Sequence, residues 1–293
     1  MKRIISLLII FAFLLCFTGC ERNENEVQIA ATTLPVFEFT SRICDGTGIT
    51  VKQLITENVS CLHDYTLKTS QMRAIENAET IVISGAGLED FLGDTLTEKT
   101  NVINASKNIT LICPPEDEKH SEHTSHSHTY DPHIWLSPAN GKIMAQNICD
   151  ELTAIYPEHK EKFSNNLNAL FEDFDNLSQY ANTQLNNLSE HKIVTFHDGF
   201  SYMADAFGLQ IVHTIEEESG AEASASELID IIKIINAHKL SAVFVEENGS
   251  TSAAQIIAAE TEVEIYQLKT AISSNGYFKA MYHNIDTLKE ALE

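Results

Sequence analysis

Between residues 27 and 155, short apolar runs alternate with segments that have helical spacing. The run "VQIAATT" is typical of a buried strand, and "LPVFEFTSRIC" predicts a helix with Pro35 in its first turn. The alternation continues through the strand-like runs "GITVKQLI", "TIVISGAG" and "VINAS" and the helix-like segment "SQMRAIENA". Strands that alternate with helices predict a parallel sheet covered by helices.

The spacing of apolar residues changes between Glu158 and Leu188, where they recur every three or four positions. They are Phe163, Leu167, Leu170, Phe171, Phe174, Leu177, Ala181, Leu185 and Leu188. This pattern predicts one long amphipathic helix. Some thirty residues at about 1.5 Å each span roughly 45 Å, which is enough to run along two lobes and join them. A coiled coil would need a stricter heptad repeat with charged flanks.

A second alternation fills residues 190–293. Its expected strands are "KIVTFHD", "LQIVHTI", "LSAVFVEE" and "VEIYQL", and its expected helices are "FSYMADAFG", "SASELIDIIKIINAHK", "SAAQIIAAET" and "YFKAMYHNIDTLKEALE". The predicted fold is therefore α/β, with two lobes that each contain a mainly parallel sheet covered by helices. We expect an N-terminal lobe over residues 27–155, a long rigid linking helix over 156–189 and a C-terminal lobe over 190–293.

The first residues predict export. "MKRIISLLIIFAFLLCFTGC" has a basic start, an apolar stretch and small residues before Cys20, which is typical of a signal peptide over residues 1–19. The small residues before the cysteine resemble a lipoprotein signal, in which the thiol of Cys20 carries the lipid. Residues 20–26 are polar and predict a short tether. Secretion with release is the alternative, because Phe17 stands where leucine is usual.

Charge and cysteine content narrow the functional classes. Of 19 basic and 42 acidic residues, the signal removes Lys2 and Arg3, which leaves 17 basic residues and a formal charge of −25. This excess argues against a nucleic-acid partner and favours cations. Of six cysteines, Cys16 is removed with the signal and Cys20 is assigned to the lipid, which leaves four. In an exported protein these favour two disulfides, in one of three possible pairings, over metal ligation. They are Cys44, Cys61, Cys113 and Cys149.

Histidines gather in residues 119–130 and just after them. The first four lie among polar residues without apolar periodicity, so we expect a flexible loop that captures metal weakly. They are His120, His123, His126 and His128. His133 differs, because Pro132 precedes it and the apolar, strand-like run "IWLSP" follows it. These neighbours predict a fixed imidazole.

Three histidines occupy comparable loop positions. His63 follows the strand "VKQLI", His133 lies in "DPHIWLSP" and His197 ends the strand "KIVTFH". Any one of them alone is better explained as a hydrogen-bonded structural histidine. Ligands of open α/β sheets bind outside the carboxyl ends of the strands, so the three together can converge on one metal ion between the lobes.

The stretches "HDYTLKTSQMRAIENAETIVISGAGLEDFL", "DPHIWLSPAN", "TFHDGFSYMADAFGLQIV", "SASELIDIIKIINAHKLSAVFVEENGS" and "YFKAMYHNIDTLKEAL" resemble the zinc- and manganese-binding solute receptors of bacterial ABC importers. The resemblance covers nearly the whole mature chain. It implies a bilobal body bridged by a rigid helix, with the metal held between the lobes by His63, His133 and His197. It further implies a monomer that delivers the metal to a membrane permease with its ATPase. In that family, a histidine-rich loop before the second ligand marks zinc receptors.

The donor atoms favour zinc over manganese. Three imidazoles suit zinc, whereas manganese prefers carboxylate oxygens, and manganese-handling relatives often have an acid at the position of His197. One departure from the family concerns "YQLKTA", where Lys269 stands in place of the expected aspartate. The fourth ligand is then water or another group such as Glu246. For Glu246, a hydrogen bond or ion pair that supports a ligand is favoured over direct ligation.

Three other functions compete with a zinc receptor. A manganese receptor of the same family and a metal-dependent adhesin share the expected fold. A zinc hydrolase could use three histidines and a water, but the sequence has no H-E-x-x-H motif. Asp64 and Asp198 adjoin two of the predicted ligands, where orienting an imidazole is the simpler role. We therefore expect a receptor that is not an enzyme.

Overall fold

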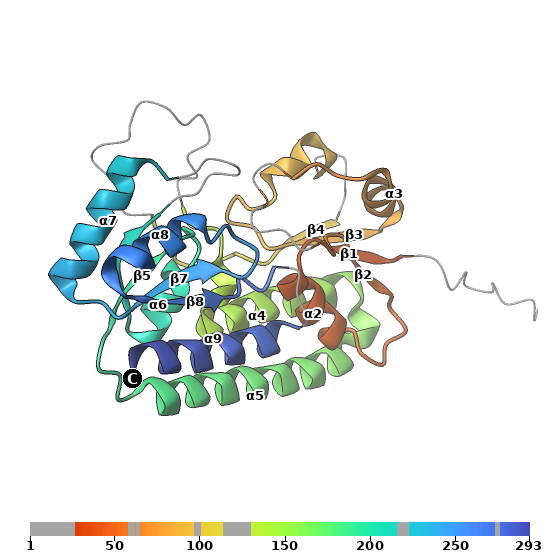
Figure 1. Cartoon of the computed structure of the whole chain (residues 1–293). Coiled ribbons are helices and arrows are strands. Elements are labelled where there is room, and N and C mark those ends of the chain that lie inside the picture. Colours follow the sequence, from red (N-terminus) through yellow and green to blue (C-terminus); the bar gives the residue numbers. More distant parts are fainter. Residues whose placement is uncertain are drawn as a thin grey trace, which may run out of the picture.

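The computed structural model describes residues 27–57, 62, 65–96, 101–113, 130–215, 223–272 and 276–293. These residues form two four-stranded sheets whose paired strands are all parallel, with helices packed around them (Figure 1). The prediction of two parallel, helix-covered sheets is confirmed. The expected signal peptide, tether and lipidation site at Cys20 lie outside the described residues, as do His120, His123, His126 and His128.

The N-terminal sheet has the strand order β2-β1-β3-β4. Its strands are β1 Ile29–Ala31, β2 Val51–Gln53, β3 Thr80–Ile83 and β4 Asn101–Asn104, and its helical segments are α2 Leu34–Ile43, α3 Thr69–Asn77 and the 3₁₀ segment η1 Asp90–Leu96. The inner strands β1 and β3 are buried throughout, as expected for strands covered on both faces. Pro35 lies in the first turn of α2, as predicted.

The C-terminal sheet repeats this order as β6-β5-β7-β8. Its strands are β5 Lys192–Thr195, β6 Gln210–Thr214, β7 Ala242–Glu246 and β8 Glu264–Leu268, and its helices are α6 Ser201–Phe207, α7 Ala225–His238, α8 Ser252–Thr261 and α9 Tyr277–Leu292. Each of these elements lies within the segment predicted for it. A capping box between Ser224 and Glu227 starts α7, because each side chain accepts a backbone N–H of the other residue.

The long helix α5, Lys160–Leu185, contacts elements of both halves. It runs beneath the two sheets and packs against α2 of the N-terminal half and α9 of the C-terminal half (Figure 1). Phe174 of α5 meets Phe39 of α2 edge-on, with ring centroids 5.3 Å apart, and Phe39 meets Tyr277 of α9 at 4.9 Å. This aromatic cluster joins the two halves through one continuous core.

The prediction that "IWLSP" is strand-like is wrong. Ile134–Leu136 form the 3₁₀ turn η2, and the unpredicted helix α4, Pro138–Ile155, follows at once. Ser137 caps α4 by accepting the Asn140 N–H, and proline occupies the first turn. A second 3₁₀ turn, η3 Pro157–His159, separates α4 from α5, so the long helix begins after Glu158. The linking helix is therefore one of a packed pair.

The predicted disulfides are wrong for the cysteines that the structure describes. Cys44, Cys113 and Cys149 are free thiols, and Cys61 lies outside the described residues. Cys44 and Cys149 are buried, and burial, with a smaller contribution from Cys149, raises the pKa of Cys44 to about 12. A buried thiol that stays protonated packs as a small apolar side chain, which accounts for these two cysteines without a bridge.

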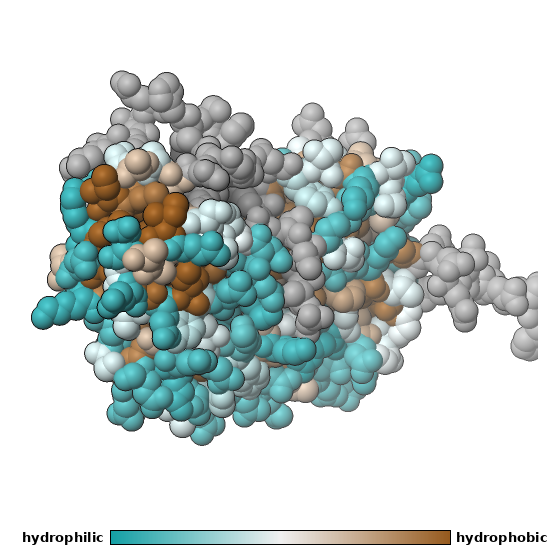
Figure 2. Space-filling model, in the orientation of Figure 1, coloured by the Kyte–Doolittle hydropathy of each residue, from teal (hydrophilic) through white to brown (hydrophobic). Residues whose placement is uncertain are grey.

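Figure 2 shows an apolar area on the surface of the C-terminal half. Apolar side chains gather over α7 and α8, where Ile229 is 53% and Ile256 is 50% exposed. They cover a separate core cluster under these two helices, to which Ile231 and Ile257 belong. Among the residues that the structure describes, no helix is long and apolar enough to cross a membrane.

Candidate metal site

His133 is held in place from one side of its ring. The side chain is 2% exposed, and its Nδ1 lies 2.9 Å from Oδ1 of Asp131, which also accepts the His133 backbone N–H at 2.8 Å. A carboxylate at Nδ1 fixes the tautomer that carries its proton there and leaves Nε2 as the metal-binding nitrogen. The fixed imidazole predicted from the sequence is thus observed, although Asp131 and not a strand provides the restraint.

Asp131 is charged when it contacts this ring. Burial raises the pKa of Asp131, but the hydrogen bonds and the charge of His133 outweigh burial, so the pKa lies below its usual value. An ionised carboxylate beside the imidazole strengthens Nε2 as a donor toward a cation. The sequence analysis did not single out Asp131, although an acid two residues before a histidine in "DPH" is a usable signal.

His197 lies two residues after β5, and its Nε2 is 3.3 Å from Nε2 of His133. The two rings meet edge-on, with centroids 5.0 Å apart and an interplanar angle of 87°. Two nitrogens that bind one tetrahedral zinc at about 2.0–2.1 Å are about 3.3–3.4 Å apart. The pair therefore already has the nitrogen spacing of two zinc ligands.

Gly199 has no side chain and so leaves room for the imidazole rings of His133 and His197. A Cβ atom at this position would lie 2.6 Å from Nε2 of His197 and 2.8 Å from Cε1 of His133. Real Cβ contacts are never so short, so any larger residue would have to displace one imidazole. Gly199 is a residue of the site that the sequence analysis missed.

Glu246, the last residue of β7, lies on the far side of His197. Its Oε2 is 3.8 Å from Nδ1 of His197, and its Oε1 accepts a hydrogen bond from the Thr270 hydroxyl at 3.2 Å. Burial raises the pKa of Glu246 to about 7, although the charge of His133 and the Thr270 hydrogen bond act in the opposite direction. Since Glu246 faces Nδ1 and not Nε2, its position favours support of His197 over direct ligation.

Lys269 does not occupy the position expected of the missing acid. Its ammonium forms an ion pair with Glu247, and its backbone N–H and C=O both bond to the Asn284 side chain at 2.8 Å. The next residue, Thr270, contacts Glu246 instead. Thr270, and not Lys269, therefore contacts the carboxylate that lies beside His197.

Two of the three predicted ligands meet in the described part of the chain. His63 and Asp64 lie outside it, and within the described residues no three His, Cys, Asp or Glu side chains are grouped so that they could hold a metal ion.

Trp135 connects three segments near the site. Its indole N–H donates to the Thr270 carbonyl at 2.7 Å, and its own carbonyl accepts the Tyr277 hydroxyl at 2.7 Å.

A family model described as zinc-uptake complex component A, periplasmic (ZnuA), matches residues 29–291. The chain belongs to this family. The match spans both sheets, the long helix, His133 and His197, so it covers every element from which the described part of the site is built.

Curated relatives of this ZnuA-family chain carry zinc in their names. It is 28% identical over 297 residues to the zinc-binding lipoprotein AdcA of Streptococcus pneumoniae, and the match covers 96% of the chain and 59% of that protein. It is 26% identical over 291 residues to the high-affinity zinc uptake system protein ZnuA of Bacillus subtilis, with 94% and 90% covered. The chain thus spans little more than half the length of the AdcA relatives.

Solved structures of the family share this fold. The Zn(II)-bound ZnuA-like domain of Streptococcus pneumoniae AdcA has a TM-score of 0.75 at 27% identity, with 92% of this chain and 99% of that one covered. A crystal structure of ZnuA gives 0.78 at 27% identity, with 91% and 100% covered. A laminin-binding adhesin of Streptococcus agalactiae gives 0.76 at 22% identity, which shows the fold alone and gives no support to adhesion.

Proposed function

We propose that this protein is the extracytoplasmic solute-binding component of a zinc ABC importer, which captures zinc and delivers it to a membrane permease with its ATPase. The observation that carries the proposal is the 3.3 Å separation of Nε2 of His133 and Nε2 of His197 in a chain of the ZnuA family. The spacing matches that of two ligands on one tetrahedral zinc ion, and a family described as a zinc-uptake component favours binding and release over hydrolysis.

Each residue has a distinct role in this proposal. His63, His133 and His197 bind zinc through imidazole nitrogens, and water is the fourth ligand. Asp131 holds His133 through Nδ1, and Glu246 supports His197 from the opposite face. Three neutral donors leave the ion its full charge, which the neighbouring carboxylates of Asp131 and Glu246 offset in part. Neutral imidazoles also make the site a poorer match for manganese.

Export and anchoring complete the proposal. The signal over residues 1–19 directs the protein out of the cytoplasm, and a lipid on Cys20 keeps it at the outer face of the cell membrane. One relative, the pneumococcal AdcA, is named a lipoprotein. The histidine-rich loop over residues 119–130 serves as an auxiliary, weaker zinc-binding segment.

Competition titration with a zinc chelator tests the proposal. The parent should bind one zinc tightly, and His133→Ala and His197→Ala should each weaken that binding by orders of magnitude, because each removes one of few metal bonds. His238→Ala is the matched control, since this exposed histidine ends α7 and contacts Lys192. Full zinc affinity in either site variant, or tight binding of manganese alone, would refute the zinc site.

A further inference from the structure

Thr270, in the segment that follows β8, has a hydroxyl that reaches the carboxylate next to His197. The hydroxyl donates to Oε1 of Glu246 at 3.2 Å, and the other carboxylate oxygen, Oε2, lies 3.8 Å from Nδ1 of His197. Glu246 is 4% and Thr270 is 6% exposed, so water has little access to this contact. Because the hydroxyl holds one carboxylate oxygen, the other stays turned toward the imidazole.

Three other segments hold the backbone around Thr270. The Asn284 side chain of α9 bonds to both the N–H and the C=O of the preceding residue at 2.8 Å. The Ile272 carbonyl accepts the N–H of Leu34, at the start of α2, at 2.9 Å. The Trp135 indole N–H donates to the carbonyl of Thr270 itself at 2.7 Å. The hydroxyl is therefore carried by a backbone that has little freedom to move.

Trp135 comes from the segment that carries the other histidine of the pair. It is fully buried two residues after His133, and the centroids of the two rings are 5.3 Å apart. Its carbonyl accepts the Tyr277 hydroxyl at 2.7 Å, which joins the same residue to α9. A continuous path of contacts thus runs from His133 through Trp135 to Thr270, and from there to the carboxylate beside the second histidine.

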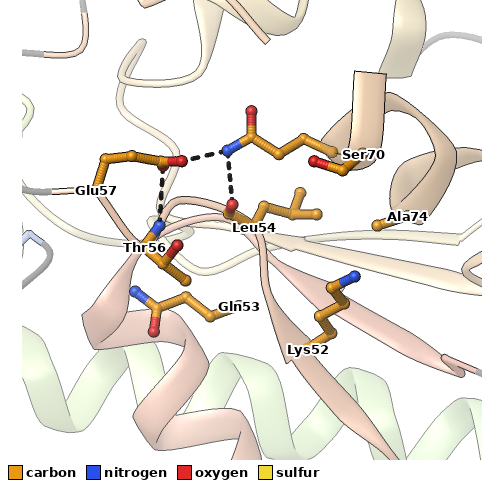
Figure 3. Close-up of a pocket in the computed structure, with 8 residues that line it drawn as sticks. Lys52, Gln53, Leu54, Thr56, Glu57, Ser70 and Ala74 are labelled. Atoms are coloured by element: carbon orange, nitrogen blue, oxygen red, sulfur yellow. Dashed lines mark hydrogen bonds between the residues drawn. The ribbon is translucent and has the colours of Figure 1, made fainter. Parts of the chain in front are cut away.

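A second polar cluster lines a cavity of about 140 Å³ between β2 and α3, which Figure 3 shows. There the Gln71 amide donates to the Leu54 carbonyl at 2.8 Å and to the Glu57 carboxylate at 3.3 Å. All three residues belong to the N-terminal half, so this cluster joins neighbouring elements of one sheet. The contacts of Thr270 differ, because they connect both halves and reach a carboxylate next to a proposed zinc ligand.

We propose that Thr270 is a positioning residue for the zinc site, whose hydroxyl holds Glu246 beside His197. This inference rests on the function proposed above. Trp135 fixes the backbone of Thr270 to the segment of His133, so the support of one ligand is built on the position of the other. Without the hydroxyl, the Glu246 carboxylate can rotate, and the imidazole of His197 loses part of its restraint before zinc binds.

Thr270→Val is the decisive variant, because it removes the hydroxyl and keeps the size and branching of the side chain. Zinc affinity from chelator competition should fall about 10-fold, at the low end of the effect of removing a partner that orients a metal ligand. The visible absorption bands of the cobalt-loaded protein should shift, because they depend on the geometry of the ligands. The melting temperature of the metal-free protein should change by a few degrees at most.

Two further variants separate the hydroxyl from packing. Thr270→Ser retains the hydroxyl and should restore most of the parent's zinc affinity. Thr287→Val is the matched control, since it removes the hydroxyl of a buried threonine of α9 and should leave zinc affinity and the cobalt bands unchanged. An equal loss of affinity in Thr270→Val and Thr287→Val would contradict a specific role of Thr270.

A double-mutant cycle tests whether Thr270 acts through Glu246. Thr270→Val should weaken zinc binding in the parent but have little further effect in the Glu246→Ala background. An equal loss in both backgrounds, or the parent's affinity and cobalt bands in Thr270→Val, would overturn the inference. Full zinc affinity in His133→Ala or His197→Ala would instead refute the zinc site itself, so the two failures are distinguishable.

Discussion

At the scale of single residues, the site is defined by which nitrogen each imidazole presents. Asp131 occupies Nδ1 of His133, and Glu246 faces Nδ1 of His197, so that both Nε2 atoms are directed at the same point. Gly199 lies against both rings and leaves no room for a side chain of its own. These neighbours therefore hold the two Nε2 atoms in positions that suit a small cation.

A methyl group at Gly199 should disturb the positions of the two imidazole rings. Gly199→Ala places a Cβ atom within 2.8 Å of both imidazoles, so at least one ring must move. Zinc affinity should fall at least 10-fold, because metal–nitrogen bonds tolerate displacements of only about 0.2 Å. Chelator competition measures the change. Gly249→Ala is the matched control, since its Cβ atom would make an ordinary contact at 3.4 Å, and equal affinities for the two variants would contradict this account.

Glu89 is a buried acid of the N-terminal half. Its carboxylate accepts hydrogen bonds from the Thr32 hydroxyl at 2.6 Å and from the backbone N–H groups of Ser84 and Gly85 at 2.7 and 2.9 Å. Burial raises its pKa from 4.5 to about 7 in spite of these bonds. The folded protein therefore holds this proton more tightly than the unfolded chain does. The resulting stabilisation is complete below about pH 4.5 and is lost as the pH rises to about 7.

Glu89→Gln removes this titration and leaves a side chain of equal size. The free energy of unfolding of the parent, relative to the variant, should fall by about 2 kcal/mol between pH 5 and pH 7. Urea unfolding of the metal-free proteins at the two pH values gives this difference. A difference that does not depend on pH would show that Glu89 has an ordinary pKa.

At the scale of elements, α4 and α5 form a helical layer that supports both sheets. Gly141 allows their close approach, because a Cβ atom there would lie 2.4 Å from the Phe174 ring. The periodic segments of the sequence predicted α5 and the four helices of the C-terminal half within a few residues. Helix α4 was missed because "IWLSP" suggested a strand, although Ser137 and Pro138 are a helix-start signal.

Gly141→Ala should weaken this layer. The added methyl group forces the Phe174 ring out of the aromatic cluster with Phe39 and Tyr277. Overpacking of this kind costs about 1–3 kcal/mol of unfolding free energy. The midpoint of urea unfolding measures it. Ala139→Ser, at an exposed position of the same helix, should leave the midpoint nearly unchanged, and an equal effect of both substitutions would contradict the proposed close packing.

At the scale of the whole molecule, one packed core links the halves that supply His133 and His197. Phe39, Phe174 and Tyr277 connect α2, α5 and α9, and Trp135 connects η2 to the loop after β8. The sequence could predict two lobes and name the histidines, because periodicity and family motifs are local. It could not predict the 3.3 Å separation of two nitrogens, or that Thr270 and not Lys269 faces Glu246, since these depend on long-range packing.

Deletion of the histidine-rich loop tests whether the tight zinc site depends on that loop. Deletion of residues 119–128 should leave the affinity of the tight site unchanged, because His133 is fixed by Asp131 and not by the loop. The number of zinc ions bound at high metal concentration should fall, since we propose that the deleted imidazoles bind zinc weakly. Isothermal titration calorimetry resolves both classes of site. Loss of the tight site on deletion would contradict this division.

The most direct test of the zinc site is the position of the metal itself. Crystals of the zinc-loaded parent, measured on both sides of the zinc absorption edge, should give one dominant anomalous peak. We predict that it lies about 2.0–2.1 Å from Nε2 of His133 and from Nε2 of His197, with the His63 imidazole as a third ligand. A dominant zinc peak away from these two nitrogens would contradict the account.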